Sequence, residues 1–220
     1  MISERQAFLD ALDGVSYLAD AEGRITAVGQ PAWLESLRRY GAEVGAADQV
    51  VGRSLFDAMH GDEVRAAYRV IHQTVLAGTR SHVAFEMRCD GPDVRRLLRM
   101  SVSVLRLPSA PPAVLYQSQL LSAIARPWMS LFDPLRIVAE IRKDGGLPII
   151  KICSFCHRVE WPAQKASDWI DPEDYYRLGG PREMRTSHGV CPRCAEAVTQ
   201  PGGAERADPS PALVQAGEMA

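Results

Sequence analysis

Four of the five cysteines form two pairs with the same spacing, and they are the residues best suited to chemistry in this chain. Two residues separate Cys153 from Cys156 and Cys191 from Cys194, and 34 residues lie between the pairs. A two-residue spacing lets one tight turn direct both sulfurs at a single ion, and two such turns supply the four thiolates of a tetrahedral Zn²⁺ site. The spacing therefore predicts a structural zinc site at these four cysteines.

Two histidines beside the cysteines leave the ligand set open. His188 lies three residues before Cys191, so it could replace one cysteine or hydrogen-bond a thiolate. His157 follows Cys156 directly and thereby also completes the attachment signature of a c-type haem. We favour the four-cysteine set because it needs neither histidine, and we expect His157 to be a solvated neighbour. A redox-active pair or an iron–sulfur cluster is a chemical alternative.

The segment between the two pairs can form a small core of its own. Its apolar side chains are Trp161, Trp169, Ile170, Tyr175, Tyr176 and Leu178. In so small a unit, metal binding supplies much of the folding free energy. We therefore expect a zinc-binding module over residues 151–200.

Composition and charge restrict the class of protein. The chain has 220 residues, 46% of them hydrophobic and 24% charged, as in an ordinary globular protein. The net charge is −2, and residues 148–200 hold 7 basic and 7 acidic side chains, so we expect no nucleic-acid partner. The start of the chain has no apolar run typical of a secretory signal, and no stretch reaches transmembrane length. We expect a cytoplasmic protein, in which cysteines stay reduced and covalent haem attachment does not occur.

Hydrophobic periodicity predicts an α+β domain over residues 1–125. The pattern indicates a five-stranded antiparallel sheet with helices packed on one face. The expected elements are a hairpin over 15–29, a helix over 31–41, a long helix over 62–78, and strands over 82–90, 95–107 and 113–121. A helical connector is expected over 126–150 and a disordered Pro/Gly/Ala-rich tail over 201–220. Cys89 alternates with apolar residues, which predicts a small buried side chain.

Three stretches of the first domain resemble the PAS family. They are "DGVSYLADAEGRITAVGQPAW", "VGRSLFDAMHGDEVRAAYRVIHQTVLAG" and "FEMRCDGPDVRRLLRMSVSVL". The resemblance implies a sensor or dimerisation module, not an enzyme, with a pocket that holds haem, flavin, a small metabolite or nothing. For a non-covalent haem it points to His72 on the long helix. Helical geometry puts this residue on the flank of the apolar stripe, where a histidine is usually solvated or locally hydrogen-bonded. The chain has no N-C-R-F-L-Q segment of the flavin photoreceptors. Haem and flavin therefore stay as alternative cofactors that no motif of the sequence supports.

The cysteine region carries a second resemblance. "ICSFCHRVEW" followed by "SHGVCPRCAEAV" resembles a C-terminal segment attached to many bacterial PAS-containing signalling proteins. His157 stands where that segment usually has lysine, so the haem signature arises from one substitution.

Together these features predict a bacterial signalling protein without catalytic activity of its own. The sequence has no glycine-rich phosphate loop, kinase signature, G-x-S-x-G or H-E-x-x-H motif. We expect a signalling partner or effector, a homodimer, a small-molecule ligand in the PAS pocket, and a signal that shifts the connector at 126–150. The alternatives are a haem- or thiol-based redox sensor and a zinc-finger transcription regulator.

Overall fold

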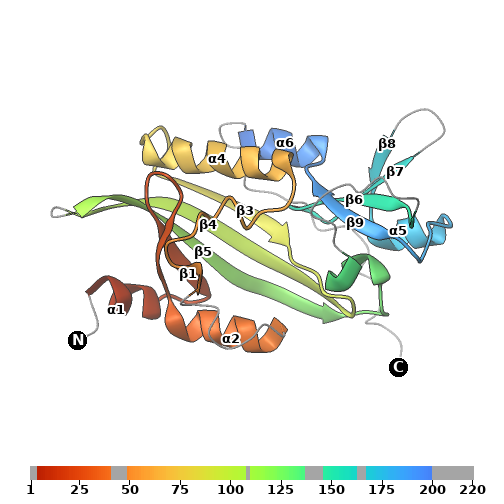
Figure 1. Cartoon of the computed structure of the whole chain (residues 1–220), viewed down its shortest axis with the longest axis horizontal. Coiled ribbons are helices and arrows are strands. Elements are labelled where there is room, and N and C mark those ends of the chain that lie inside the picture. Colours follow the sequence, from red (N-terminus) through yellow and green to blue (C-terminus); the bar gives the residue numbers. More distant parts are fainter. Residues whose placement is uncertain (1–3, 41–48, 108–109, 137–145, 163–166, 200–220) are drawn as a thin grey trace, which may run out of the picture.

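The computed structural model describes residues 4–40, 49–107, 110–136, 146–162 and 167–199 of the chain. The larger unit contains α1 (Glu4–Asp10), β1 (Val15–Ala19), β2 (Ile25–Val28), α2 (Gln30–Tyr40), α4 (Asp62–Leu76), β3 (His82–Arg88), β4 (Val94–Leu107) and β5 (Ala110–Ala125). The C-terminal part contains the short 3₁₀ turns η1 (Ser130–Phe132) and η2 (Pro134–Arg136), then β6 (Ile149–Cys153), β7 (Val159–Pro162), β8 (Ser167–Ile170), α5 (Pro172–Arg177), β9 (Arg185–Gly189) and α6 (Pro192–Thr199). Figure 1 shows the small sheet beyond one end of the large sheet, with α6 beside α4.

The large sheet is antiparallel throughout and has the strand order β2-β1-β5-β4-β3. Tyr116 of the central strand lies opposite Tyr17 of β1 on one side and Val102 of β4 on the other. This sheet and its helices confirm the predicted α+β class, with a PAS-like five-stranded antiparallel sheet and a separate small sheet that carries the cysteine group.

Helix α4 covers the inner face of the large sheet. Val64, Tyr68, Ile71 and Val75 recur at helical spacing and are all buried, so the apolar stripe drives the helix onto the sheet. Asp62 and Glu63 lie in its first turn, where their negative charges interact favourably with the positive end of the helix dipole. The preceding Gly61 has φ +92°, and a side chain there would meet the carbonyl oxygen of His188 at 2.6 Å. The start of α4 thus lies directly against the cysteine region.

The two faces of the large sheet are covered differently. On β1, Tyr17 and Ala19 contribute to the core under α4. Ser16, which alternates with them, turns its hydroxyl to the carbonyl oxygen of Leu9 in α1 at 3.2 Å. Helix α1 therefore packs on the opposite face from α4, as Figure 1 shows.

The small sheet has the strand order β8-β7-β6-β9, and β6 and β9 are its parallel pair. Helix α5 and η1 pack against it. Its core consists of six buried residues: Leu131, Ile150, Ile152, Val159, Tyr175 and Met184. Trp161, Ile170 and Tyr176 of the predicted apolar cluster pack around this core.

Parts of the sequence predictions fall outside the described residues or differ from the structure. Within the predicted helical connector, the described residues include the 3₁₀ turns η1 and η2 and the first two residues of β6. The remainder of the expected helix lies outside the described residues, as does the tail at 201–220. The boundaries at 125, 150 and 200 stay predictions. Cys89 is exposed rather than buried, because β3 ends one residue earlier and the chain leaves the sheet there; that prediction was wrong.

Candidate metal centre

Strand register brings the two cysteine pairs together. Because β6 and β9 run parallel, their carboxyl ends meet at the same edge of the small sheet, where Cys153 lies opposite Gly189. The first cysteine turn follows β6 and the second follows β9. A crossover through β7, β8 and α5 is what fills the 34-residue spacing.

Backbone hydrogen bonds shape the first turn and join it to the second. The His157 N–H donates to the Cys153 carbonyl oxygen at 2.9 Å, which closes the turn around Ser154 and Phe155. His157 has φ +58° and is the one non-glycine residue with positive φ among those described. The Ser154 N–H donates to the Gly189 carbonyl oxygen at 2.9 Å. The sharp return of the chain thus directs both sulfurs of this pair toward the second pair.

The four sulfurs form one compact group. The Sγ atoms of Cys153, Cys156, Cys191 and Cys194 all lie within 4.8 Å of one another, and none is in a disulfide. The Cys156 and Cys191 sulfurs are 3.7 Å apart. Four sulfurs at about 2.3 Å from a central Zn²⁺ would be separated by about 3.8 Å in a tetrahedron. The donor set and its spacing therefore fit a tetrahedral metal ion.

Backbone N–H groups also point at the sulfurs. The Cys191 N–H donates to the Cys153 Sγ at 3.4 Å, and the Cys194 N–H donates to the Cys191 Sγ at the same distance. Hydrogen bonds of this kind favour the thiolate over the thiol. Helix α6 begins inside the second turn, so Cys194 is presented from its first turn.

The protonation of these four residues is interdependent. Hydrogen bonds from Cys156, Cys191 and Cys194, with the Cys191 N–H, lower the pKa of Cys153. The same contact with Cys153 raises the pKa of Cys156 and of Cys194, because a second anion beside the first is unfavourable. A central cation removes this conflict by favouring all four thiolates together.

His188 lies next to this group but is not part of it. The clustered ligand atoms are the four sulfurs, whereas the His188 ring stacks against His60 with centroids 6.0 Å apart. Its Nδ1 is buried and has no hydrogen-bond partner among the residues that the structure describes. Burial, with smaller contributions from His157 and His60, lowers the pKa of His188 to about 4. The ring is therefore neutral at pH 7.

His157 is not solvated, and that prediction was wrong. Its side chain is only 13% exposed and stacks on Phe132 with centroids 5.1 Å apart. The Asp90 N–H donates to its Nδ1 at 3.4 Å. The positive φ at His157 turns the ring away from the sulfurs and toward the large sheet.

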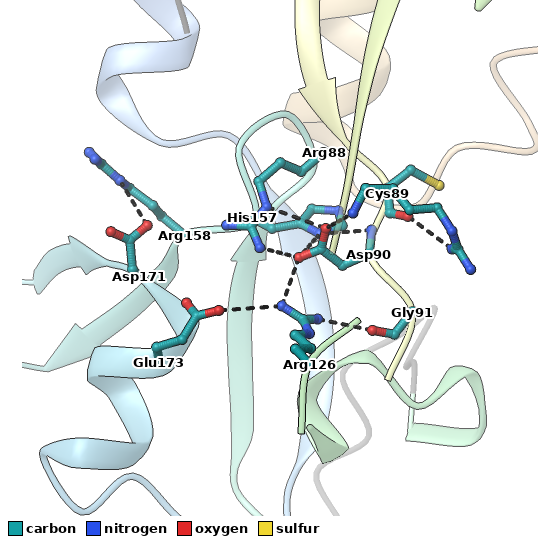
Figure 2. Close-up of polar contacts among 10 residues, drawn as sticks. Arg88, Cys89, Asp90, Gly91, Arg126, His157, Arg158, Asp171 and Glu173 are labelled. Atoms are coloured by element: carbon teal, nitrogen blue, oxygen red, sulfur yellow. Dashed lines mark hydrogen bonds and ion pairs between the residues drawn. The ribbon is translucent and has the colours of Figure 1, made fainter. Parts of the chain in front are cut away.

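Asp90 is the centre of a buried charge network at the junction of the two sheets (Figure 2). Its carboxylate is fully buried and pairs with Arg88 and with Arg126, whose Nη1 is 3.0 Å away, while His157 Nδ1 lies at 3.6 Å. The Arg126 guanidinium also reaches Glu173 of α5 at 3.6 Å. Although burial opposes it, the surrounding hydrogen bonds and the positive charge of Arg88 hold the pKa of Asp90 well below its usual range.

A second polar contact fixes the other cysteine turn to α4. The Glu63 carboxylate accepts a hydrogen bond from the Val190 N–H at 3.0 Å and pairs with Lys151 of β6 at 3.0 Å. Although burial opposes it, these partners lower the pKa of Glu63. Each cysteine turn is thus attached to a different element of the larger unit.

Sequence reasoning identified the four cysteines whose sulfurs cluster but not Asp90 or Glu63. Asp90 and His157 are 67 positions apart, and Glu63 and Val190 are 127 apart. A weak signal was present: Asp90 and Asp93 are the two acidic residues in a stretch that also holds Arg88, Arg95 and Arg96.

His72 lies in the core rather than on a solvated flank, so its predicted placement was wrong. It is fully buried, its Nδ1 lies 2.9 Å from the Tyr116 hydroxyl, and Phe56 packs edge-on against its ring. Burial lowers the pKa of His72. Among the described residues, it belongs to no group of three or more metal-ligating side chains.

Comparisons with known proteins give a likeness in fold over about half of the chain. No family model matches the sequence, and no curated protein matches it significantly. The PAS domain of BvgS from Bordetella pertussis is 12% identical, with a TM-score of 0.41, over 54% of this chain and 84% of that one. The PAS domain of nitrogen regulation protein NR(II) from Vibrio parahaemolyticus is 13% identical, with a TM-score of 0.34, over 54% and 99%. Drosophila melanogaster Cycle PAS-B with bound ethylene glycol is 16% identical, with a TM-score of 0.34, over 49% and 99%.

At these identities and TM-scores the likenesses say nothing about activity or ligand. The fold rests on the strand order and pairing described above. Within the described part of the chain, no helix has the length and apolar character needed to cross a membrane.

Proposed function

We propose that this chain is a signal-sensing or interaction protein in which a PAS-like domain is coupled to a structural zinc site. The observation that carries the proposal is the placement of the sulfur group. Cys153 and Cys191 belong to the same buried core as the inner face of the large sheet. An ion held there would fix the C-terminal part directly against the sensor-like domain.

The geometry favours a structural ion over a catalytic one. Catalytic zinc sites use three protein ligands and leave one position for water, whereas structural sites have four. Here four sulfurs converge, and Cys153 and Cys191 are 0% and 1% exposed. Four thiolates at two-residue spacings also suit zinc better than the harder cations that prefer oxygen. We therefore propose Zn²⁺ bound by four cysteines and no catalytic activity.

The sensing role is supported by the PAS-like sheet and by the contacts across the junction. We propose that the protein acts in the cytoplasm, forms a homodimer and relays a ligand or partner signal from the sheet to an effector through the cysteine region. The contacts of Asp90 with His157 and of Glu63 with Val190 offer a direct route that does not depend on residues 126–150.

Metal analysis together with an absorbance spectrum of natively purified protein tests this proposal. We expect one zinc per chain and no visible absorbance band. A Soret band would support the haem-sensor alternative, and visible iron–sulfur absorbance would replace zinc in the site. Protein without metal but with a titratable dithiol would indicate a redox sensor. Salt-dependent DNA binding would indicate a transcription regulator.

A further inference from the structure

Phe155 connects the metal centre to the core of the large sheet. It lies inside the first cysteine turn, between Cys153 and Cys156, yet its side chain is 3% exposed and belongs to the core under α4. Its ring stacks on Tyr68 of α4 with centroids 5.6 Å apart and planes at 18°. It also meets Phe85 of β3 at 5.4 Å.

The backbone of Phe155 is attached to the same place. Its carbonyl oxygen accepts a hydrogen bond at 2.7 Å from the N–H of Arg88, the last residue of β3. Tyr68 and Phe85 pack edge-on against each other with centroids 6.2 Å apart. Phe155 therefore completes an aromatic cluster to which α4, β3 and the cysteine turn each contribute one ring.

The turn that presents Phe155 depends on what holds its two ends. His157 has a positive φ, which is unfavourable for a residue with a side chain. The two ends of the turn are Cys153 and Cys156, whose sulfurs belong to the four-sulfur group, so an ion bound there would hold both ends in place. Phe155 and the two ligands Cys153 and Cys156 lie within the same four-residue turn. The position of the Phe155 ring therefore follows the conformation of the metal-bound turn.

We propose that occupancy of the metal site controls whether Phe155 closes the core of the PAS-like domain. With the ion bound, the turn holds the ring between α4 and β3. When the ion is removed, the turn relaxes, Phe155 leaves, and Tyr68 and Phe85 become accessible at this end of the sheet. Because coupling between two sites is reciprocal, an apolar ligand or partner that displaces Phe155 weakens metal binding by the same factor. This proposal rests on the proposed function, since it requires a metal at the four cysteines.

Hydrogen–deuterium exchange of the full-length, metal-loaded protein tests the proposal. Removal of the metal with a chelator should speed exchange in residues 149–162. It should also speed exchange in the first half of α4 (62–69) and in β3 (82–88), by about tenfold or more, equivalent to about 1.4 kcal/mol of local protection. The hairpin of β1 and β2 (15–28) should not change. Addition of zinc should restore the original pattern.

Substitutions separate the ring from the metal. Phe155→Ala with zinc still bound should speed exchange at 62–69 and 82–88, and Phe155→Leu should do so less, which keeps the test usable where the alanine variant does not fold. Phe132→Ala is the matched control: it removes a phenyl ring that contacts the same turn at His157 but lies outside the large core, and it should leave 62–69 and 82–88 unchanged.

Two results would overturn the proposal in distinguishable ways. If chelation speeds exchange in residues 149–199 while 62–69 and 82–88 keep their protection, the proposed control of Phe155 by the metal is wrong, but the metal site itself is supported. If the protein holds no metal at the four cysteines, both the proposed function and the proposed control of Phe155 are wrong.

Discussion

The two hydrophobic cores of this molecule differ in how many buried side chains stabilise them. Among the described residues, the core under α4 contains nineteen buried side chains, whereas the core of the small sheet contains six. Six apolar side chains bury too little surface to hold a domain of this size without a metal or a neighbour. Four members of the larger core come from the cysteine region: Cys153, Phe155, Cys191 and Val198. We therefore expect the small sheet to depend on the proposed ion and on the large sheet, and the large sheet to depend less on the small one.

Loss of one ligand should produce the largest difference between the two cores. Cys153→Ser should abolish zinc binding and unfold the small sheet, since structural zinc contributes on the order of 10 kcal/mol in small domains. The large sheet should stay folded. Metal content and hydrogen exchange over 149–199 measure the effect. Cys89→Ser is the matched control, because Cys89 is exposed and outside the sulfur group. A Cys153→Ser protein that keeps its zinc would contradict the assignment.

Removal of the buried Asp90 carboxylate at the junction should have the second-largest effect on stability. Asp90→Ala leaves the guanidinium groups of Arg88 and Arg126 without a counter-charge, and such changes lower the free energy of unfolding by about 3–5 kcal/mol. Urea unfolding of the metal-loaded protein measures it. Asp93→Ala removes an exposed carboxylate from the same turn and should change stability by less than about 0.5 kcal/mol. Equal effects of the two substitutions would mean that the network does not hold the sheets together.

The contact at the start of α4 should matter less because it is half-exposed. Glu63→Ala removes the acceptor for the Val190 N–H and the partner of Lys151, which should cost about 1 kcal/mol. Asp62→Ala controls for the helix dipole, since Asp62 lies in the same first turn and is 94% exposed at its side chain. If both variants lose the same stability in urea unfolding, the contact with Val190 adds nothing beyond the dipole.

The smallest effect on metal content is expected at His188. His188→Gln should keep one zinc per chain, because the His188 ring stacks on His60 and the four sulfurs form the ligand group without it. Atomic absorption on the purified variant measures this. Loss of zinc would favour a site of three cysteines and one histidine.

The strands of the large sheet, helix α4 and the cysteine group could be predicted from short-range patterns in the sequence. Alternation and helical periodicity indicated the strands and α4, since each element buries one face. The paired two-residue spacings predicted the sulfur group. The burial of His72 was not predicted because helical geometry shows only which residues of α4 face the sheet. Phe56, from the loop before α4, packs against the His72 ring and covers that flank of the helix. Cys89 was misplaced because alternation does not reveal where a strand ends.

The docking of the two cores could not be predicted from the sequence. Asp90 contacts His157 across 67 positions of sequence, and Glu63 contacts Val190 across 127, so both contacts depend on how the large sheet packs against the cysteine turns. Phe155 was passed over because it stood between two ligands, where it read as a spacer in the C-x-x-C motif. Such residues are recognised by what surrounds them in space, and no sequence period encodes that.

X-ray absorption at the zinc edge, on natively purified full-length protein, tests the central claim most directly. We expect one zinc per chain with four sulfur neighbours at about 2.3 Å and no nitrogen neighbour. A shell with three sulfurs and one imidazole nitrogen, or protein that carries no zinc, would contradict a site made by Cys153, Cys156, Cys191 and Cys194.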